Sequence, residues 1–266
     1  MTSTAAWGWR ALALVGVLAI LLGVSLVLAA PQTAAPSGAV APAAATESPD
    51  EPVSAIEPTP APIIESSVDV IPMEQRPTAA FLGDSITVGM TDPTTGAIGE
   101  HSWFYGLLDD TLGGVRFAGM TAENGRSTAW MAGQVWNALY PAPDLLIVHG
   151  GTNDVSGEIT PPVVVNNLER IRLAADSVGV PLAVCTIPPR AEPAADARAL
   201  AVNDAIRAWA TANGVILLDT AAPLRDPVLG GWLPGYTTDG LHPTPEAARL
   251  MSQAAAKTLR EIPLGV

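Results

Sequence analysis

The sequence predicts an α/β domain built on a parallel sheet, and three observations support this prediction. From residue 77 to the end of the 266-residue chain, short apolar runs alternate with longer segments whose apolar residues recur every three or four positions. One run, Asp144–His149, is almost continuously apolar, as expected of a strand that is buried on both faces. Polar clusters follow several of the runs, at the strand ends where parallel sheets present functional residues.

The pattern of residues 1–30 predicts a membrane anchor whose short N-terminal end is cytoplasmic. Ala11–Ala30 contains no charged residue and no proline, and as a helix it would be about 30 Å long, close to the thickness of the bilayer core. Arg10 precedes this run, and Trp7 and Trp9 suit the membrane interface. By the positive-inside rule the remainder of the chain is extracytoplasmic, so we expect a single-pass protein of the cell membrane.

A cleaved signal peptide is the alternative for this segment, and it would release a secreted protein. The apolar run is longer than the usual signal-peptide core. The best cleavage position, after Ala30, places Leu28 where a small residue is preferred and Pro31 directly after the cut. These features favour a retained anchor, and both alternatives imply export.

The next segment, Pro31–Arg76, predicts a disordered acidic linker. It holds nine prolines and seven acidic residues against a single arginine. Such a composition buries too little apolar surface to offset the entropy of ordering the chain, and its prolines keep it extended. We expect a spacer that holds the following domain away from a membrane.

The predicted domain, residues 77–266, contains five strand candidates and several helical patterns. Apolar residues at helical spacing mark one helix between 164 and 178 and another around Val202–Trp209. A last helix covers about Pro245–Glu261, with Thr244 as its N-cap. The strand candidates are Thr78–Leu82, Val115–Ala118, Asp144–His149, Pro181–Ile187 and Val215–Leu218.

Charge and composition exclude several classes of function. The net charge is −13, with 13 Lys and Arg against 26 Asp and Glu, so the chain lacks the basic balance that nucleic-acid binding requires. A single cysteine, Cys185, excludes an intrachain disulfide and a cysteine-based zinc site. The three histidines show no spacing typical of metal ligands. We therefore expect neither a metal nor a nucleic-acid partner.

Four polar clusters follow predicted strands or precede the last helix. Because the carboxyl ends of parallel strands meet at one edge of a sheet, we expect these clusters to converge. Each cluster alone also fits an ordinary turn or a helix cap. Their conjunction within one domain favours a functional site. The clusters are Gly83–Thr87, Asn124–Ser127, Gly150–Asp154 and Asp239–Pro243.

The residue types in these clusters suit acyl transfer. Ser85 is a nucleophile candidate, and a serine hydroxyl needs a base such as His242 to take its proton. Asp239, three residues before this histidine, can orient the imidazole and stabilise its charged form. The oxyanion formed by the attack needs hydrogen-bond donors. Candidates are the backbone N–H groups of Ser85 and Gly125 and the side-chain amide of Asn153.

The four clusters resemble the sequence blocks of SGNH hydrolases, in the GDSL esterase/lipase superfamily. The family is named for Ser, Gly, Asn and His, which match Ser85 in GDSIT, Gly125 in ENGRST, Asn153 in GGTND and His242 in DGLHP. Gly119 is a poorer match for the glycine. The resemblance covers residues 77–266, and it implies a three-layer α/β/α sandwich with a flavodoxin-like five-stranded parallel sheet.

The resemblance also implies roles for these residues and the absence of any metal or organic cofactor. Ser85 would be the nucleophile and an oxyanion donor, Gly125 and Asn153 would complete the oxyanion hole, and His242 would be the base. Asp239 would complete the triad, although some members orient the histidine through a backbone carbonyl instead.

Four further residues are candidate substrate contacts: Asp84, Thr152, Trp103 and Trp232. Asp84 also suits the role of organising the turn before Ser85, and Trp103 equally suits packing on the core. His149 ends an apolar strand and is interpreted as a buried histidine whose hydrogen bonds are satisfied, without a catalytic role.

The predicted function is an extracytoplasmic serine esterase that hydrolyses small acyl esters, acetyl in particular, on a small molecule or a polysaccharide. A lipase or lysophospholipase and an O-acyltransferase of the same fold are the enzymatic alternatives. A non-catalytic cell-wall-binding module is the alternative from another class, and the complete set of site residues counts against it.

Overall fold

The computed structural model describes residues 72–109, 112 and 114–262, so the predicted anchor and almost all of the predicted linker lie outside it. Within these described ranges, no helix combines the length and the apolar character needed to cross a membrane. The described chain begins at the 3-10 helix η1 (Met73–Gln75). Arg76 is buried, and its carbonyl accepts a hydrogen bond of 2.8 Å from Nε of Arg116. The last residue of the predicted linker therefore packs as part of the domain.

The five predicted strands are all present and form one parallel sheet in the order β2-β1-β3-β4-β5. The order reverses between β1 and β3, which is where open α/β sheets bind their ligands. β2 is an edge strand and extends four residues beyond its apolar run, because one-sided burial there does not require continuous apolar sequence. The strands are β1 (Thr78–Gly83), β2 (Arg116–Ala122), β3 (Leu145–His149), β4 (Leu182–Cys185) and β5 (Ile216–Leu218).

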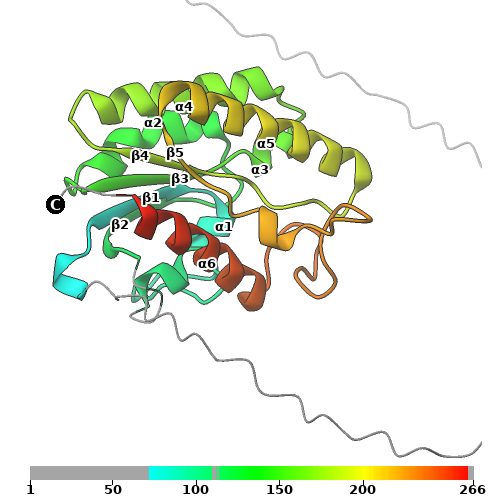
Figure 1. The fold of residues 1–266 in the computed structure, drawn as a ribbon, viewed down its shortest axis with the longest axis horizontal. Coiled ribbons are helices and arrows are strands. Elements are labelled where there is room, and N and C mark those ends of the chain that lie inside the picture. The colour runs from blue at the N-terminus through cyan, green and yellow to red at the C-terminus, as the bar shows by residue number, and fades with distance from the viewer. Residues whose placement is uncertain (1–71, 110–111, 113, 263–266) are drawn as a thin grey trace, which may run out of the picture. The chain divides into compact units, whose positions relative to one another are not determined.

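Helices cover both faces of the sheet, which confirms the predicted α/β/α layering (Figure 1). One face lies beneath α2 (Thr128–Leu139), α4 (Pro161–Asp176) and α5 (Pro193–Asn213). The other lies beneath α6 (Pro245–Glu261) and the 3-10 helix η2 (Tyr105–Leu108). Two short helices, α1 (Ser85–Val88) and α3 (Thr152–Ser156), follow β1 and β3 directly. A last 3-10 helix, η3 (Ala222–Leu224), follows β5.

The helix α2 was missed by the sequence prediction. Its buried side is formed by Met131, Val135, Ala138 and Leu139. Trp136 lies on the opposite side, where 57% of its surface is exposed. A large apolar residue on the solvent face obscures the helical period, so the pattern did not point to one buried stripe.

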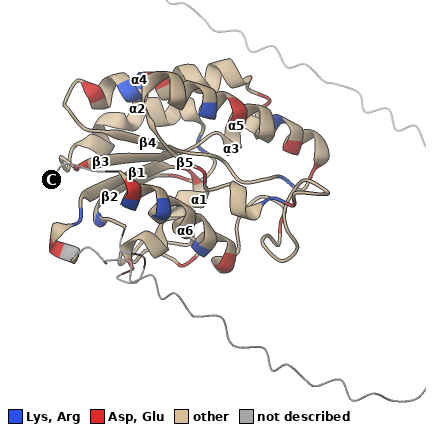
Figure 2. Ribbon diagram, viewed as in Figure 1, with Lys and Arg blue, Asp and Glu red and all other residues tan. Residues whose placement is uncertain are grey.

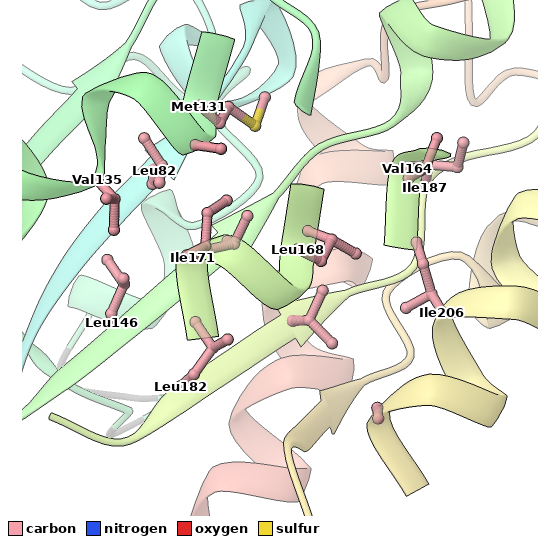
Figure 3. Packing of buried hydrophobic residues seen from close by; sticks show 14 of the residues in the cluster. Leu82, Met131, Val135, Leu146, Val164, Leu168, Ile171, Leu182, Ile187 and Ile206 are labelled. Atoms are coloured by element: carbon pink, nitrogen blue, oxygen red, sulfur yellow. The ribbon is translucent and has the colours of Figure 1, made fainter. Parts of the chain in front are cut away.

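The core consists of two clusters, one on each side of the sheet, and strand residues alternate between them as their period of two requires. In β1, Ala80 and Leu82 join the cluster beneath α2 and α4, whereas Ala79 and Phe81 join the cluster beneath α6. Side chains in the first cluster come from strands and helices alike, among them Leu82, Met131, Leu146, Leu168, Ile171 and Leu182 (Figure 3).

Charged residues lie on the helices and loops around this core (Figure 2). On α4, Arg172 pairs with both Glu169 and Asp176, and Arg207 on α5 pairs with Asp219. These partly exposed pairs each contribute at most about 1 kcal/mol to stability. The sheet is therefore held by apolar burial, which leaves a rigid frame for the loops at the strand ends.

Candidate active site

Ser85 is presented by a tight connection between β1 and α1. Asp84 is the N-cap of α1, and its Oδ1 accepts a hydrogen bond of 3.0 Å from the backbone N–H of Ile86. A Cβ atom at Gly83 would lie 2.0 Å from Oγ1 of Thr87, so this position requires glycine. The result is a half-buried serine at the first position of a helix, at the edge where the strand order reverses.

His242 joins Ser85 and Asp239 into one hydrogen-bonded line. Its Nε2 lies 2.9 Å from Oγ of Ser85, and its Nδ1 lies 2.7 Å from Oδ2 of Asp239. The other carboxylate oxygen of Asp239 accepts the backbone N–H groups of Leu241 at 2.9 Å and of His242 at 2.8 Å. The loop that carries the aspartate is thus closed on itself just before α6, and the histidine ring has one orientation.

The charge of Asp239 decides where the ring proton resides. Partial burial by itself would raise the pKa of Asp239, but hydrogen bonds from the His242 ring and from the backbone N–H groups of His242 and Leu241 together hold that pKa well below its ordinary value. An ionised carboxylate can only accept hydrogen bonds. Nδ1 of His242 therefore carries the ring hydrogen and donates a hydrogen bond to Asp239. The lone pair on Nε2 then faces the hydroxyl of Ser85, as general-base chemistry requires.

Two candidate oxyanion donors line the same cavity as Ser85 and His242. Gly125 has a φ of +75°, a conformation that favours glycine, and a Cβ there would meet open space. The side-chain amide of Asn153 donates to the carbonyl of Arg126 at 3.0 Å and to Oδ2 of Asp84 at 3.3 Å. The second bond is long, so an oxyanion at this site can compete for that hydrogen through a stronger, charge-assisted bond.

Two buried aspartates tie the loops of the site together. Burial, together with the nearby charge of Asp154, raises the pKa of Asp84 to about 7, although the backbone N–H of Ile86 opposes the rise. Asp154 accepts the backbone N–H of Thr128 at 2.9 Å and its hydroxyl at 2.6 Å. One interpretation of the sequence had Asn153 and Asp154 cap the helix that follows them. Asp154 instead holds the start of α2.

The site opens into a cavity of about 780 Å³. The structure brings all five predicted catalytic and oxyanion residues to its wall: Ser85, Gly125, Asn153, Asp239 and His242. They come from the segments that follow β1, β2, β3 and β5, so the predicted convergence at one sheet edge is what the fold produces.

The four predicted substrate contacts are not among the residues that line this cavity, so their contact with substrate stays a prediction. Trp103, Asp84 and Thr152 are buried, with at most 1% of their surface exposed. Trp103 packs edge-on against Phe81 in the core, and Asp84 serves the turn before Ser85. Trp232 is half-buried, and its Nε1 donates to the carbonyl of Gly240 at 3.2 Å, which braces the loop that carries Asp239.

Part of the cavity wall was not predicted. Val88 and Met90 follow Ser85 within five residues, and Leu241 and Pro245 lie within three residues of His242. Their closeness in sequence to the catalytic candidates is the signal that could have found them. His101 also lines the cavity.

Arg190 was also missed, and it links two of the site loops. Its Nη1 donates to the carbonyl of Thr152 at 3.0 Å and to Oγ of Ser156 at 3.2 Å, at either end of α3. The next residue, Ala191, donates its backbone N–H to the carbonyl of Gly240 at 3.0 Å. The loop after β4 therefore holds the asparagine loop and the histidine loop in fixed positions.

His149 is buried, as interpreted from the sequence, and lies outside the cavity wall. Desolvation lowers its pKa to about 4, so the ring is neutral and stacks on Trp103 at 5.7 Å. Within the part of the chain that is described, neither ring nitrogen has a hydrogen-bond partner. Within the same part, no group of three or more His, Cys, Asp or Glu residues is placed to hold a metal ion.

Comparisons with known proteins assign the chain to a family. Residues 81–250 match the model of the GDSL-like Lipase/Acylhydrolase family, whereas a comparison with curated proteins gives no match. Similar solved structures include a GDSL-like lipase from Bacteroides thetaiotaomicron, with 22% identity over 71% of this chain and 90% of that chain and a TM-score of 0.56. Axe2, an acetylxylan esterase from Geobacillus stearothermophilus, shares 16% identity over 69% of this chain and 94% of that chain, with a TM-score of 0.58. TesA shares 21% identity over 70% of this chain and 99% of that chain, with a TM-score of 0.56.

At these identities the solved structures establish the fold, and the family match establishes the class of activity. The chain therefore belongs to the GDSL-like lipase/acylhydrolase family and is a carboxylic ester hydrolase.

Proposed function

We propose that this protein is an extracytoplasmic serine esterase that removes small acyl groups, acetyl in particular, from carbohydrate. Ser85, His242 and Asp239 form its catalytic triad. The observation that carries the proposal is the continuous line from Asp239 to His242 at 2.7 Å and from His242 to Ser85 at 2.9 Å. Gly125 and Asn153 lie on the wall of the same cavity, as an oxyanion hole requires.

In the acylation step, Nε2 of His242 takes the hydroxyl proton of Ser85 while Oγ bonds to the carbonyl carbon of the ester. The carbonyl oxygen becomes an oxyanion, which accepts hydrogen bonds from Asn153 and from the backbone N–H groups of Ser85 and Gly125. When the intermediate collapses, the bond to the alcohol oxygen breaks and His242 returns the proton to that oxygen. The alcohol leaves, and Ser85 carries the acyl group.

In the deacylation step, His242 takes a proton from water, and the resulting hydroxyl adds to the acyl carbon. Collapse of the second intermediate breaks the bond to Oγ, and the proton returns to Ser85. The carboxylic acid leaves and the enzyme is regenerated. Asp239 stays ionised throughout and stabilises the protonated ring in both steps.

Two observations support an acetylated carbohydrate outside the cytoplasm as the substrate. One of the solved structures with the same fold is an acetylxylan esterase. The uncharged run Ala11–Ala30 and the proline-rich segment after it are typical of an exported domain on a spacer. Wall or environmental polysaccharide would lie within reach of such a domain.

The first test is hydrolysis of p-nitrophenyl esters, from acetate to palmitate, by the purified full-length protein. In Ser85→Ala we expect turnover of p-nitrophenyl acetate to fall by about 10⁴-fold or more, because the nucleophile is lost. Ser177→Ala removes a hydroxyl that donates to the carbonyl of Ala174 at the end of α4, outside the cavity wall, and it should leave turnover unchanged.

Chain-length preference decides between the alternatives. A preference for acetate supports the proposal, whereas a preference for palmitate contradicts it in favour of a lipase. A wild-type protein that turns over no ester faster than Ser85→Ala would contradict hydrolysis altogether, and transfer to a sugar acceptor or wall binding would then be tested by direct assay.

The proposed location is tested separately, by treating intact cells of the native host with a protease. Digestion of the domain without lysis is expected of an extracytoplasmic protein. Protection until lysis would contradict the proposed location and would leave the esterase chemistry untouched.

A further inference from the structure

The cavity wall is built mainly from the chain on either side of the catalytic residues. Beyond the five catalytic and oxyanion residues, most of its wall comes from two segments, residues 86–91 directly after Ser85 and residues 241–245 around His242. His101 joins them, and its Nδ1 lies 3.4 Å from the carbonyl of Pro243, the residue after the catalytic histidine. The loop that carries His242 therefore forms part of the cavity wall.

The proposed reaction determines which part of an ester lies next to the loop that carries His242. The oxygen of the departing alcohol must lie within reach of Nε2 of His242, because that atom supplies its proton. The carbonyl oxygen must face the donors at Gly125 and Asn153. The alcohol part thus extends along the loop that carries His242, and the acyl part points away from it.

We propose that this cavity binds the alcohol part of the ester, that this alcohol is bulky and uncharged, and that Met90 is a specificity-determining residue. This inference rests on the proposed triad and goes beyond it, because it assigns the two halves of the substrate to different places. A volume of about 780 Å³ suits an alcohol the size of one or two sugar rings.

The wall chemistry favours an uncharged alcohol. Apolar side chains come from Val88, Met90, Leu241, Pro243 and Pro245, and its threonines and asparagines are neutral. Among the described residues that form this wall, none is a lysine or an arginine, and Asp239 is ionised. An alcohol that carries phosphate or carboxylate would find no lysine or arginine there and would be repelled by Asp239.

Met90 is held at the rim by an unusual backbone. Its φ is +62°, in the left-handed region that side chains rarely adopt, and 76% of its surface is exposed. The preceding Gly89 has a φ of +49°, and a Cβ there would lie 2.0 Å from the backbone nitrogen of Ser102. The residue before Met90 therefore has to be glycine, because the backbone of Ser102 leaves no room for a side chain. An exposed methionine on a strained backbone does not stabilise the fold by burial. Its flexible thioether instead suits contact with an apolar ligand face.

The test measures kcat/KM of the full-length protein on two ester series. The first holds the acyl group as acetate and enlarges the alcohol from ethanol through benzyl alcohol to methyl xyloside. The second holds ethanol and lengthens the acyl group from acetate to octanoate. We expect Met90→Ala to lower kcat/KM about tenfold for the bulky acetates and to leave every ethyl ester unchanged.

Two variants and a charged substrate sharpen the test. Met90→Gln keeps the length of the side chain and should fall between wild type and Met90→Ala on the bulky acetates. Val228→Ala removes an apolar side chain that is 86% exposed outside the cavity wall, and it should change neither series. The wild type should hydrolyse glycerol monoacetate at least tenfold better than the acetate ester of glycerol phosphate.

An effect of Met90→Ala that grows along the acyl series would overturn the inference, as would no effect in either series or a preference for the phosphate ester. A wild type that hydrolyses no ester, or a Ser85→Ala variant that retains activity, would instead contradict the proposed function and this inference with it.

Discussion

Asp84 lies between the sheet and the nucleophile, and its burial has a consequence for stability. Burial raises its pKa to about 7, far above the value of 3.8 expected in an unfolded chain. Between these values the folded protein binds a proton that the unfolded chain does not bind. The free energy of unfolding therefore decreases as pH rises through this window, and Asp84 stabilises the fold most when it is protonated.

Replacing Asp84 with Asn should remove this pH dependence, because an amide can still cap α1 but does not titrate. Between pH 4 and 7 the free energy of unfolding of the wild type should fall relative to that of Asp84→Asn, by on the order of a few kcal/mol in total. Urea denaturation across this range measures the difference. Parallel pH profiles for the two proteins would contradict the expectation.

Asp226→Asn is a control for which the pH dependence of the free energy of unfolding should have the opposite sign. Backbone N–H groups of Leu229 and Val228 lower the pKa of Asp226, so any stability that it contributes is lost as pH falls.

At the scale of elements, the site depends on how α2 begins. Ser127, the N-cap of this helix, makes no capping bond with its side chain. Asp154, from the loop after β3, accepts the backbone N–H and the hydroxyl of Thr128 instead, and Asn167 of α4 donates to the same hydroxyl at 3.1 Å. The loop that carries Gly125 is thereby fixed relative to the loop that carries Asn153.

Asp154→Ala should therefore damage both stability and catalysis. The buried N–H and hydroxyl of Thr128 would lose their acceptor, at a cost of about 2–4 kcal/mol in the free energy of unfolding. Displacement of the oxyanion donors should lower kcat more than it raises KM. Asp176→Ala removes a half-exposed carboxylate from α4 and should cost no more than about 1 kcal/mol. Equal effects of the two substitutions in denaturation would contradict this role of Asp154.

At the scale of the whole molecule, Ile64–Val266 is one compact unit. Both hydrophobic clusters and the whole described wall of the cavity belong to it. We therefore expect this unit to fold and to hydrolyse esters without the residues that precede it.

A chain that begins at Ile64 should match the full-length protein in Tm and in kcat/KM for p-nitrophenyl acetate. A chain that begins at Pro77 is the matched control, because it lacks Arg76, which is buried and accepts the hydrogen bond from Arg116. We expect the shorter chain to have the lower Tm in a thermal melt. Loss of activity on truncation to Ile64 would contradict the independence of this unit.

The five strands, the long helices α4, α5 and α6 and the five residues at the cavity wall could be predicted because their signals are local. Leu145–His149 is apolar throughout, and Ser85 and Asn153 directly follow strands, so topology alone brings them to one edge. The start of α6 after Thr244 likewise follows from a cap and a proline at adjacent positions.

By itself, the sequence determined the fold class, the family and the residues that meet at the sheet edge, because periodicity and strand-end position follow from the order of residues. The tertiary structure decided which side chains face the substrate. Trp103 and Thr152 turned out to be buried and Met90 exposed at the cavity, because the direction of a loop side chain is set by packing against segments distant in sequence. Asp154 caps a helix 26 residues earlier for the same reason, and only the folded chain brings the two together.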